Sequence, residues 1–491
     1  MSSAATALVE PISQILPTPF LGQHVGLAIF DINHDGAPDI LFAAGRHWVD
    51  QSYALINLGQ IFNSEGDFEG MRFSSALPVG PPGGYYQIDA APTSSDNTTQ
   101  IMVLLVGGTC HVDTPTQYGS CVIGENTPAR LLEVDVSGCS IQNPDVECKL
   151  EWEEVWEDPH ARGDRNGGFA YFEDTLHPSI ALLGQGGVEI YHHSYQQEPS
   201  SLVDMNYDEF RIPAPDKIDP RSDYARYAGF ASSATLLGGA IAAGRRSDYD
   251  PPQVDSKGSV KRLNLLVYKD KQSSSSSTFE SYFLPSKISG EPYPGNPSIS
   301  IQSTGFHFDD IDGDGIPDLL EATFLYSNQR VRGHNLPQRI HFLNARGHVK
   351  KTLVVHESEE GDAGRSVTTG QIFSDSALPD VVFASAKGKV TVFANLGVGE
   401  SGAFRGLEQR YQFSATNPQC QVRKVAVVPM AQSGDDNECW IGVVTAVACG
   451  TPKYLGENEI FYVKGSCEGH KRRAMSQIDG GTFRSESTRI G

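Results

Sequence analysis

The chain repeats one short pattern along its length, and this repeat limits the folds that it can adopt. In five segments a glycine is followed five residues later by an acid, and a short apolar run comes soon after. These segments begin at Gly26, Gly84, Gly168, Gly305 and Gly370. Two more segments, from Gly229 and Lys424, keep the apolar run without the acid. Units that recur in this way indicate a repeat architecture, in which each unit buries its apolar face against its neighbours.

Each unit contains about four strand-like stretches. The apolar run is followed by a second run with alternating apolar and polar residues, such as KVTVFANL at 389–396, and then by a more polar segment. Alternation with period two, in runs rich in Val, Ile, Phe and Tyr, predicts half-buried strands. Four-stranded units repeated around an axis form a β-propeller. The sequence therefore predicts an all-β fold, a seven-bladed β-propeller of four-stranded blades. An irregular array of β-sandwiches is the alternative, and it does not explain the four-strand order.

We expect a single domain over residues 25–491, with units that start near residues 25, 84, 168, 229, 305, 370 and 424. The last unit ends in an expected outer strand at 483–490, so it would be complete in itself. Residues 1–24 form an N-terminal segment with two open roles. It would add a ring-closing strand, or it would seal the seam between the last and first blades.

Two units carry a nine-residue acidic loop. The fifth unit has Asp at loop positions 1, 3, 5 and 9 and Gly at position 6, and the first unit differs by Asn at position 3. Ca²⁺ takes six to eight oxygen ligands, and clustered carboxylates repel one another unless a cation lies among them. The expected Ca²⁺ ligands are Asp31, Asn33, Asp35, Ala37 (carbonyl) and Asp39 in the first unit, and Asp310, Asp312, Asp314, Ile316 (carbonyl) and Asp318 in the fifth.

Asn33 keeps an oxygen ligand but removes one charge, so we expect the first site to be slightly weaker than the fifth. The sixth unit has a loop three residues shorter, from Asp375 to Asp380, that lacks two ligand positions. We therefore expect no tight Ca²⁺ binding in the sixth unit.

An EF-hand is the rival interpretation of the fifth loop, because Glu321 stands at position 12. Three features oppose it. Pro317 at position 8 has no N–H group to donate. The flanking segments are expected to be strands rather than helices, and the related loop in the first unit has Phe42 at position 12. Glu321 would then be either an extra ligand or a strand residue.

The acidic loops, the apolar strand that follows them, and the Asn-Leu-Gly at Asn57 and Asn395 are similar to FG-GAP/VCBS repeats. This family includes integrin α-subunit heads and secreted lectin-like propellers. The resemblance covers the chain from about residue 20 to 491. It is strong in units 1, 5 and 6 and weak in units 2, 4 and 7. It implies a propeller with calcium loops between the first two strands of a blade, and it leaves the function open.

The charge and hydropathy of the chain exclude some partners. With 60 acids against 38 bases the net charge is −22, which argues against binding to a nucleic-acid backbone. No apolar run approaches the roughly 18 residues needed to span a membrane, so we expect no direct membrane span. The N-terminus lacks a signal peptide as it stands. Either a leader was removed, or export follows another route.

The cysteines favour an oxidising compartment. Eight cysteines form two clusters, and an even number with this grouping indicates disulfides. Zinc binding is less favoured because no C-x₂-C pair occurs, and free buried thiols are the other alternative. The cysteines are Cys110, Cys121, Cys139, Cys148, Cys420, Cys439, Cys449 and Cys467. We expect an extracellular or lumenal location, although no leader is visible in this chain.

The sequence favours a binding or adhesion module for a carbohydrate or protein ligand. Long insertions at 107–130, 194–225, 244–261 and 325–338 would carry the binding, since loops on rigid scaffolds commonly do. The acidic run from Glu151 to Asp158 includes Trp152 and Trp156, and it is either a sugar-stacking surface or an amphipathic outer strand. A structural docking subunit and a polysaccharide lyase or hydrolase are the alternatives. The enzyme is less favoured because the sequence assembles no convergent acids with a base.

Overall fold

The structure is a computed structural model of the chain, and all elements in its described part are β-strands. It describes residues 11–19, 25–45, 49–93, 99–108, 122–123, 125–139, 148–158, 166–171, 178–184, 187–193, 207–213, 230–236, 239–244, 261–269, 278–285, 300–326, 337–357, 364–373, 376–414, 420–432, 438–449 and 457–466. Among these residues no helix is long and apolar enough to cross a membrane.

Six four-stranded blades each come from one stretch of the described chain. Blade 1 consists of β2 (Gly26–Phe30), β3 (Asp39–Ala43), β4 (Asp50–Leu55) and β7 (Leu77–Gly83). Blade 2 consists of β8 (Tyr85–Pro92), β9 (Gln100–Gly107), β10 (Arg130–Asp135) and β11 (Glu151–Glu157). Blade 3 consists of β12 (Asn166–Ala170), β13 (Ser179–Gly184), β14 (Gly187–His193) and β15 (Tyr207–Pro213).

The other three blades follow the same antiparallel order. Blade 4 consists of β16 (Phe230–Ser233), β17 (Ala240–Gly244), β18 (Lys261–Lys269) and β19 (Thr278–Pro285). Blade 5 consists of β20 (Ser300–Asp309), β21 (Asp318–Tyr326), β22 (Pro337–Leu343) and β23 (Val349–Glu357). Blade 6 consists of β24 (Gly364–Gly370), β25 (Asp380–Ser385), β26 (Lys389–Asn395) and β27 (Leu407–Ser414).

A further sheet, which we call the closing sheet, joins the two ends of the described chain. Its strands are β28 (Cys420–Gln432), β29 (Glu438–Cys449), β30 (Glu459–Ser466) and β1 (Ile12–Ile15). β1 pairs antiparallel with β30, from Ile12 opposite Tyr462 to Ile15 opposite Glu459. The closing sheet lies between blade 6 and blade 1, because β28 contacts both β24 and β2.

The prediction of seven blades, each complete within its own unit, is wrong. In the described residues six blades are built in that way, and the four strands of the closing sheet come from both ends of the chain. The physical reason is the exposed edge that β30 would otherwise present, since pairing with β1 covers that edge and ties the ends of the ring together. Residues 483–490, the expected outer strand, lie outside the described residues. Residues 1–24 were expected to add a strand or to seal the seam between the last and first blades, and the structure shows the added strand.

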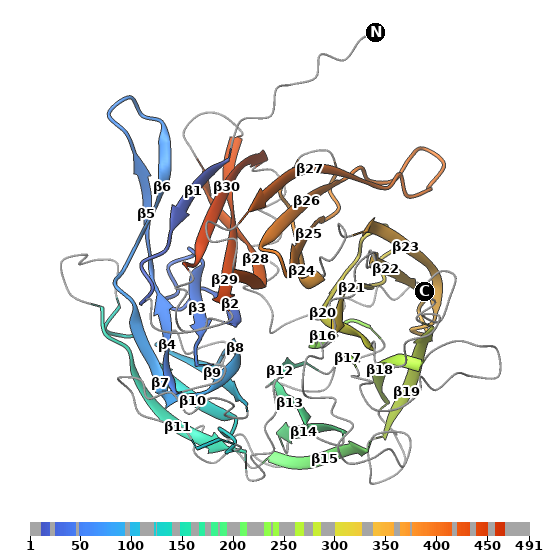
Figure 1. Cartoon of the computed structure of the whole chain (residues 1–491), viewed down its shortest axis with the longest axis horizontal. Coiled ribbons are helices and arrows are strands. Elements are labelled where there is room, and N and C mark those ends of the chain that lie inside the picture. Colours follow the sequence, from blue (N-terminus) through green and yellow to red (C-terminus); the bar gives the residue numbers. More distant parts are fainter. Residues whose placement is uncertain are drawn as a thin grey trace, which may run out of the picture.

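The sheets stand around one axis with their first strands innermost (Figure 1). Each first strand contacts the next in the order β2, β8, β12, β16, β20, β24 and β28, and β28 contacts β2 again. The described part of the molecule is therefore a closed β-propeller of mostly four-stranded blades.

The fourth strand of blade 1 also differs from expectation. The more polar segment that follows the second run of the first unit, at 68–73, is β6 (Phe68–Phe73), and it pairs with β5 (Asn57–Phe62) in a separate two-stranded hairpin rather than with the third strand. The true fourth strand is β7, whose Pro78, Pro81 and Pro82 hide its strand character in the sequence. An outermost strand tolerates proline because one edge needs no N–H donors.

The hairpin β5–β6 packs over the closing sheet. The ring of Phe68 stacks on Trp440 with centroids 5.0 Å apart and meets Tyr462 edge-on at 5.1 Å. Gln14 of β1 donates from Nε2 to the Met71 carbonyl at 2.7 Å, and its Oε1 accepts the Met71 N–H at 3.1 Å. Figure 1 shows β5 and β6 beside β1 and β30. The hairpin thus holds β1, the strand that closes the ring, in its position.

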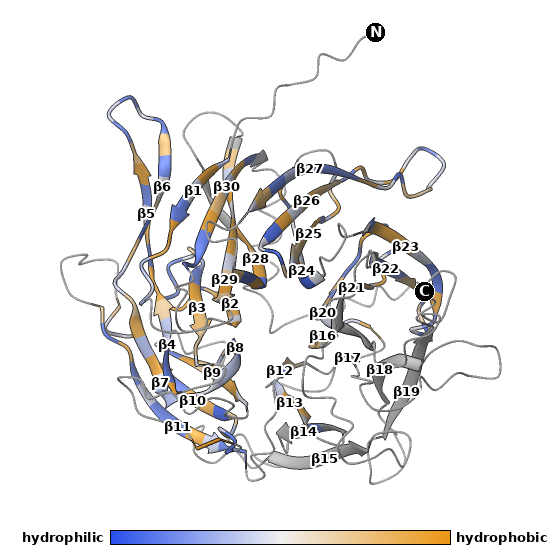
Figure 2. Cartoon of the chain, in the orientation of Figure 1, coloured by the Kyte–Doolittle hydropathy of each residue, from blue (hydrophilic) through white to orange (hydrophobic). Residues whose placement is uncertain are grey.

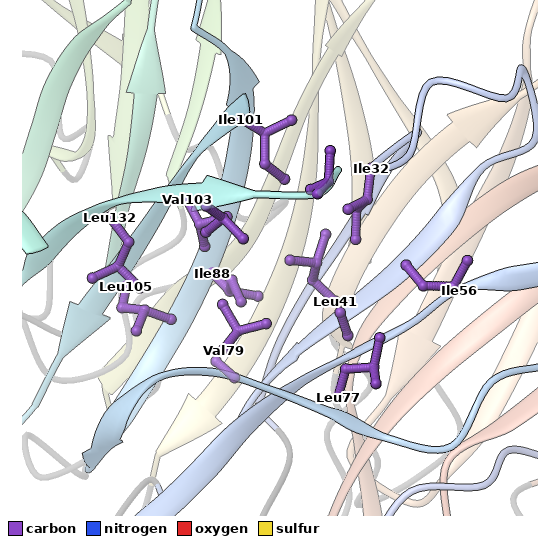
Figure 3. Packing of buried hydrophobic residues seen from close by; sticks show 14 of the residues in the cluster. Ile32, Leu41, Ile56, Leu77, Val79, Ile88, Ile101, Val103, Leu105 and Leu132 are labelled. Carbon is purple, nitrogen blue, oxygen red and sulfur yellow. The ribbon is translucent and has the colours of Figure 1, made fainter. Parts of the chain in front are cut away.

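The core lies between neighbouring blades. Second strands such as β3 are buried along their whole length, whereas the outer strand β11 is largely exposed and the outer strand β27 has both exposed and buried residues. Figure 2 shows β3 as hydrophobic and β27 with hydrophilic stretches. One cluster joins Leu41 of blade 1 to Ile88 and Val103 of blade 2 (Figure 3). Burying a side chain of this size stabilises the fold by about 1.5–3 kcal/mol.

The recurring glycines lie where first strands approach one another. A Cβ added at Gly26 would lie 2.8 Å from Cα of Gln87 in blade 2, and one at Gly305 would lie 2.8 Å from Cα of Ser366 in blade 6. At Gly370 it would lie 2.5 Å from a side-chain carbon of Val427 in the closing sheet. The repeated glycine thus marks a close contact between blades, since contacts under about 3 Å leave no space for any side chain.

Substitution of Gly305 by Ala tests this packing. We expect Gly305→Ala to reduce the free energy of unfolding by about 1–3 kcal/mol, because the methyl group meets backbone of the next blade. Gly399→Ala is the matched control, since its nearest neighbour would be 3.6 Å away. Urea unfolding of both variants measures the difference. Equal stability of the two would show that the strands can separate at no cost.

Candidate functional site

The acidic loop of blade 5 connects β20 to β21 and gathers three carboxylates. Ligand oxygens of Asp310, Asp312 and Asp314 all lie within 4.8 Å of one another. Oxygens that share one Ca²⁺ at 2.3–2.6 Å are separated by at most about 5 Å. The structure therefore brings together the first, third and fifth expected ligands in a geometry of the right size.

Local hydrogen bonds shape this loop. Asp310 accepts the N–H groups of Gly313 at 2.8 Å and Gly315 at 2.9 Å, and Asp314 accepts the N–H of Ile316 at 2.9 Å. Gly313 and Gly315 have φ of 76° and 80°, in the left-handed region that glycine adopts without strain. The glycine at position 6 therefore makes the turn, as the sequence predicts, and position 4 makes a second one.

The acidic loop of blade 1 connects β2 to β3 and has similar bonds, although its first residue accepts the N–H of position 5 rather than that of position 4. Asp31 accepts the N–H groups of Asp35 at 3.0 Å and Gly36 at 2.9 Å, and Asp35 accepts the N–H of Ala37 at 2.6 Å. The Asn33 amide donates from Nδ2 to Asp35 at 2.9 Å. Its Oδ1 is buried and accepts no hydrogen bond from the described residues. A buried acceptor without a donor is costly, and a cation would satisfy it.

The environment of the loops raises the pKa of several carboxyls. Burial raises the pKa of Asp39 to about 8 and the pKa of Asp318 to about 7. The N–H groups that bind each carboxylate lower its pKa, but by less than burial raises it. Burial, and then the charge of Asp314, raises the pKa of Asp312. Burial likewise raises the pKa of Asp31. Burial therefore disfavours the ionised form of these carboxyls, and a bound cation would favour it.

The ninth loop residue has a second role that the sequence did not indicate. Asp318 accepts the N–H of Ile311 in the loop at 3.1 Å and the N–H of Leu343 at the end of β22 at 3.1 Å. Asp39 joins the N–H groups of Ile32 and Asn57 in the same way, at 2.8 and 2.7 Å. Asp318 thus connects its loop to the last residue of the third strand, and Asp39 connects its loop to the chain just after the third strand.

Blade 6 keeps this connection although its loop has lost ligand positions. Asp380 accepts the N–H groups of Ile372, Phe373 and Asn395, each at 2.7 Å. Asp375 and the residue before it lie outside the described residues. Asp380 is present although its loop lacks two ligand positions. Its main role is therefore structural.

The Asn-Leu-Gly sequence completes the connection. Asn395 donates from Nδ2 to the Pro379 carbonyl at 3.0 Å and accepts the N–H of Gly397 at 2.9 Å. The same amide also donates to the Ile311 carbonyl of blade 5 at 2.9 Å. Asn57 repeats the first two bonds in blade 1, to Pro38 at 3.3 Å and from Gly59 at 3.0 Å. The Asn-Leu-Gly sequence therefore stabilises the fold, because its asparagine side chain binds backbone carbonyls of the loops.

Each acidic loop lies at a seam between blades. Its second residue is fully buried, Ile32 among side chains of blade 2 and Ile311 among those of blade 6. Figure 3 shows Ile32 near Ile101 of blade 2. The loop geometry is consequently coupled to the packing of two blades.

Glu321, at position 12 of the fifth loop, is a strand residue. It is buried in β21, where its Oε2 lies 2.9 Å from Nε2 of His341 and 3.5 Å from the Arg339 guanidinium. Strands β20 and β21 flank the loop. The EF-hand interpretation is therefore excluded, and so is the role of Glu321 as an extra ligand.

Lys350 is a neighbour of the fifth loop that the sequence did not reveal. Its ammonium group donates to Oδ2 of Asp314 from the start of β23. The two residues are 36 positions apart, so no local pattern could have connected them. The acidic loop of blade 1 has no such lysine or arginine among its described neighbours.

Asp89 was grouped with the loop acids by its spacing from Gly84, but it lies inside β8. Its Oδ2 accepts the N–H of Phe169 in blade 3 at 2.9 Å. Burial raises the pKa of Asp89 to about 6, and burial lowers the pKa of Lys424 in the closing sheet to about 8. Asp89 therefore connects two first strands, and it is not equivalent to Asp31 or Asp310.

The other expected binding features are only partly described. The run from Glu151 is the outer strand β11, on which Trp152 is 40% exposed and Trp156 packs against Tyr191 with ring centroids 4.9 Å apart. The four expected insertions fall largely outside the described residues. Trp152 is thus the more exposed tryptophan of this run.

The cysteines behave as expected where they are described. Cys139 and Cys148 form a disulfide in blade 2. Cys420 and Cys439 are also disulfide-bonded, and no described cysteine is free. Cys110, Cys121 and Cys467 lie outside the described residues.

Comparison with known proteins adds no family. No family model and no curated protein sequence matches the chain. Among solved structures it is similar to Chaetomium thermophilum Raptor, with 11% identity over 90% of this chain and 28% of that chain, at a TM-score of 0.41. It is also similar to the Dos1 propeller, with 9% identity over 91% of this chain and 79% of that chain, at a TM-score of 0.36. The chain spans 28% of the Raptor chain. The assignment of this chain to the β-propeller class therefore rests on its own sheets.

Substitution of Asp380 separates the structural task of the ninth residue from ion binding. Asp380→Ala leaves three N–H groups without their acceptor, so we expect a loss of about 2–4 kcal/mol in unfolding free energy in EDTA. Exposed Glu400 in the same blade provides the control variant Glu400→Ala. Chemical denaturation measures both. A loss that occurs only with Ca²⁺ present would instead make Asp380 a ligand.

Proposed function

We propose that this chain is a calcium-stabilised β-propeller that acts as a binding or docking module in an oxidising compartment. The observation that carries the proposal is the grouping of Asp310, Asp312 and Asp314 around a volume that suits one Ca²⁺. The resemblance of the acidic loops to FG-GAP/VCBS repeats is in accord with it. The propeller itself is a rigid scaffold, and loops on such scaffolds commonly carry binding.

The chain offers a suitable donor set for Ca²⁺. The ion would be held in blade 5 by carboxylates of Asp310, Asp312 and Asp314 and by the carbonyl of Ile316. Asp318 would contribute through the lone pairs that remain after its two backbone bonds, because a carboxylate has about four acceptor sites. The ion supplies positive charge beside Asp312 and Asp318, whose pKa values burial has raised.

Blade 1 offers the second set, from Asp31, Asn33, Asp35, the Ala37 carbonyl and Asp39. The buried Oδ1 of Asn33 supports this proposal because it lacks a donor among the described residues. Since each loop packs into a seam, an ion there would stabilise the contact between two blades. We therefore infer that Ca²⁺ stabilises the fold and that the ligand binds elsewhere.

The disulfide Cys139–Cys148 supports an extracellular or lumenal location. The ligand would be a carbohydrate or a protein. Exposed Trp152, flanked by Glu151 and Glu153, is the described feature that suits a sugar ring, because aromatic rings present an apolar face beside polar groups.

Thermal unfolding with and without Ca²⁺ tests the ion. At a hundredfold excess over Kd, binding adds about 2.7 kcal/mol, so we expect the melting temperature to rise by about 2–5 °C relative to EDTA. Asp312→Ala should lose much of that increase because it removes a ligand. Glu69→Ala, an exposed acid outside the loops, should keep it. An identical melting curve in EDTA would contradict the calcium proposal.

The ligand class is tested with a glycan array and with co-purification of protein partners. For a carbohydrate ligand we expect binding that Trp152→Ala reduces at least about tenfold, since stacking on one aromatic ring contributes about 0.5–1.5 kcal/mol beyond its buried area. Trp156→Phe is the control, because Trp156 packs against Tyr191. Stable protein partners with no glycan binding would support docking instead.

A further inference from the structure

Lys350 places a positive charge against the acidic loop of blade 5. Its Nζ donates to Oδ2 of Asp314, the fifth loop residue and one of the three clustered carboxylates. The side chain of Lys350 is 40% exposed and that of Asp314 is 31% exposed. The ammonium therefore reaches the cluster from the solvent side, at an oxygen that the ion would also use.

The fold holds Lys350 in this position. Leu343, at the end of β22, donates its N–H to Asp318 of the loop at 3.1 Å. The turn that follows is closed by the bond from the Asn344 N–H to the His348 carbonyl at 2.9 Å, and Lys350 is the second residue of β23. The acidic loop and this turn thus lie at the same end of blade 5, joined by a buried carboxylate.

In the loop of blade 1 the fifth residue has a neutral partner instead of a lysine. There Oδ2 of Asp35 accepts the neutral amide of Asn33 at 2.9 Å. Among the described residues no lysine or arginine forms an ion pair with Asp31 or Asp35. The two loops therefore share a backbone conformation, but only the loop of blade 5 has a charged partner from another strand.

We propose that Lys350 is a tethered cation that competes with Ca²⁺ for the loop of blade 5 and so sets the affinity of that site. This inference rests on the proposed calcium function. Without the ion, Lys350 offsets the repulsion among the three carboxylates. When Ca²⁺ enters, the ammonium and the divalent ion repel each other at a separation of a few Å. Lys350 then leaves Asp314 and extends into solvent, which its flexible four-carbon stem permits.

The competition has two opposite consequences for Lys350→Met. Without the ion, the acidic loop loses its positive partner, so the melting temperature in EDTA falls. With the ion, no ammonium has to be displaced, so the Kd for Ca²⁺ at this loop decreases by about three- to thirtyfold, as expected for removing one repulsive charge near a half-exposed site. A residue that only supported the loop would weaken both states together.

The experiment is isothermal titration of Ca²⁺ into Lys350→Met in the Asp31→Ala background, where the loop of blade 1 lacks a ligand. Lys351→Met is the matched control, since it removes the same charge from the next residue, which is exposed and forms no ion pair with the loop acids among the described residues. The same comparison in the otherwise wild-type chain, with a two-site fit, covers the case in which Asp31→Ala does not fold.

Tighter binding in Lys350→Met than in Lys351→Met, together with a lower melting temperature in EDTA, supports the proposal. If the chain binds Ca²⁺ and the two variants have equal affinity, the role of Lys350 is overturned and the calcium function stands. If neither the unsubstituted chain nor any variant binds Ca²⁺, the calcium function fails, and the competition fails with it.

Discussion

The close approach of neighbouring first strands is the constraint on which the structure depends. At Gly26 and Gly305 an added Cβ would lie 2.8 Å from the backbone of the next blade. Since no side chain fits there, the strands meet backbone to backbone, and the buried second strands of adjacent blades come close enough to share a core. The acidic loops begin directly after these first strands, so the same contact places them at the seams.

Each acidic loop combines two tasks in one short sequence. Its ninth residue connects the loop to the third strand, as Asp380 does even where two ligand positions are missing. In blade 5 its first, third and fifth residues cluster their oxygens and accept N–H groups of the turn. The structural task explains why the loop keeps its shape, and the clustered charge explains why a cation would stabilise it. Lys350, on another strand of the same blade, contacts this cluster of charges.

The strands and the loops could be predicted because their signals are local. Apolar runs and period-two alternation identify most strands, and the loop acids lie within nine residues of one another. The errors arose where local signals mislead. Prolines hid β7, so β6 was taken for the fourth strand, and the spacing from Gly84 grouped Asp89 with the loop acids although it lies within a strand. The count of complete units was wrong because the closing sheet takes β1 from the other end of the chain.

By itself the sequence determined the all-β propeller class and the positions of the two acidic loops, because these depend on periodicity and on spacings of a few residues. The tertiary structure alone decided the contacts between distant positions. Asn395 meets Ile311 from 84 residues away, Lys350 meets Asp314 from 36 away, and Tyr462 donates to Gln14 from 448 away. Such pairs form only when the blades close into a ring, since closure, and no local preference, brings their elements together.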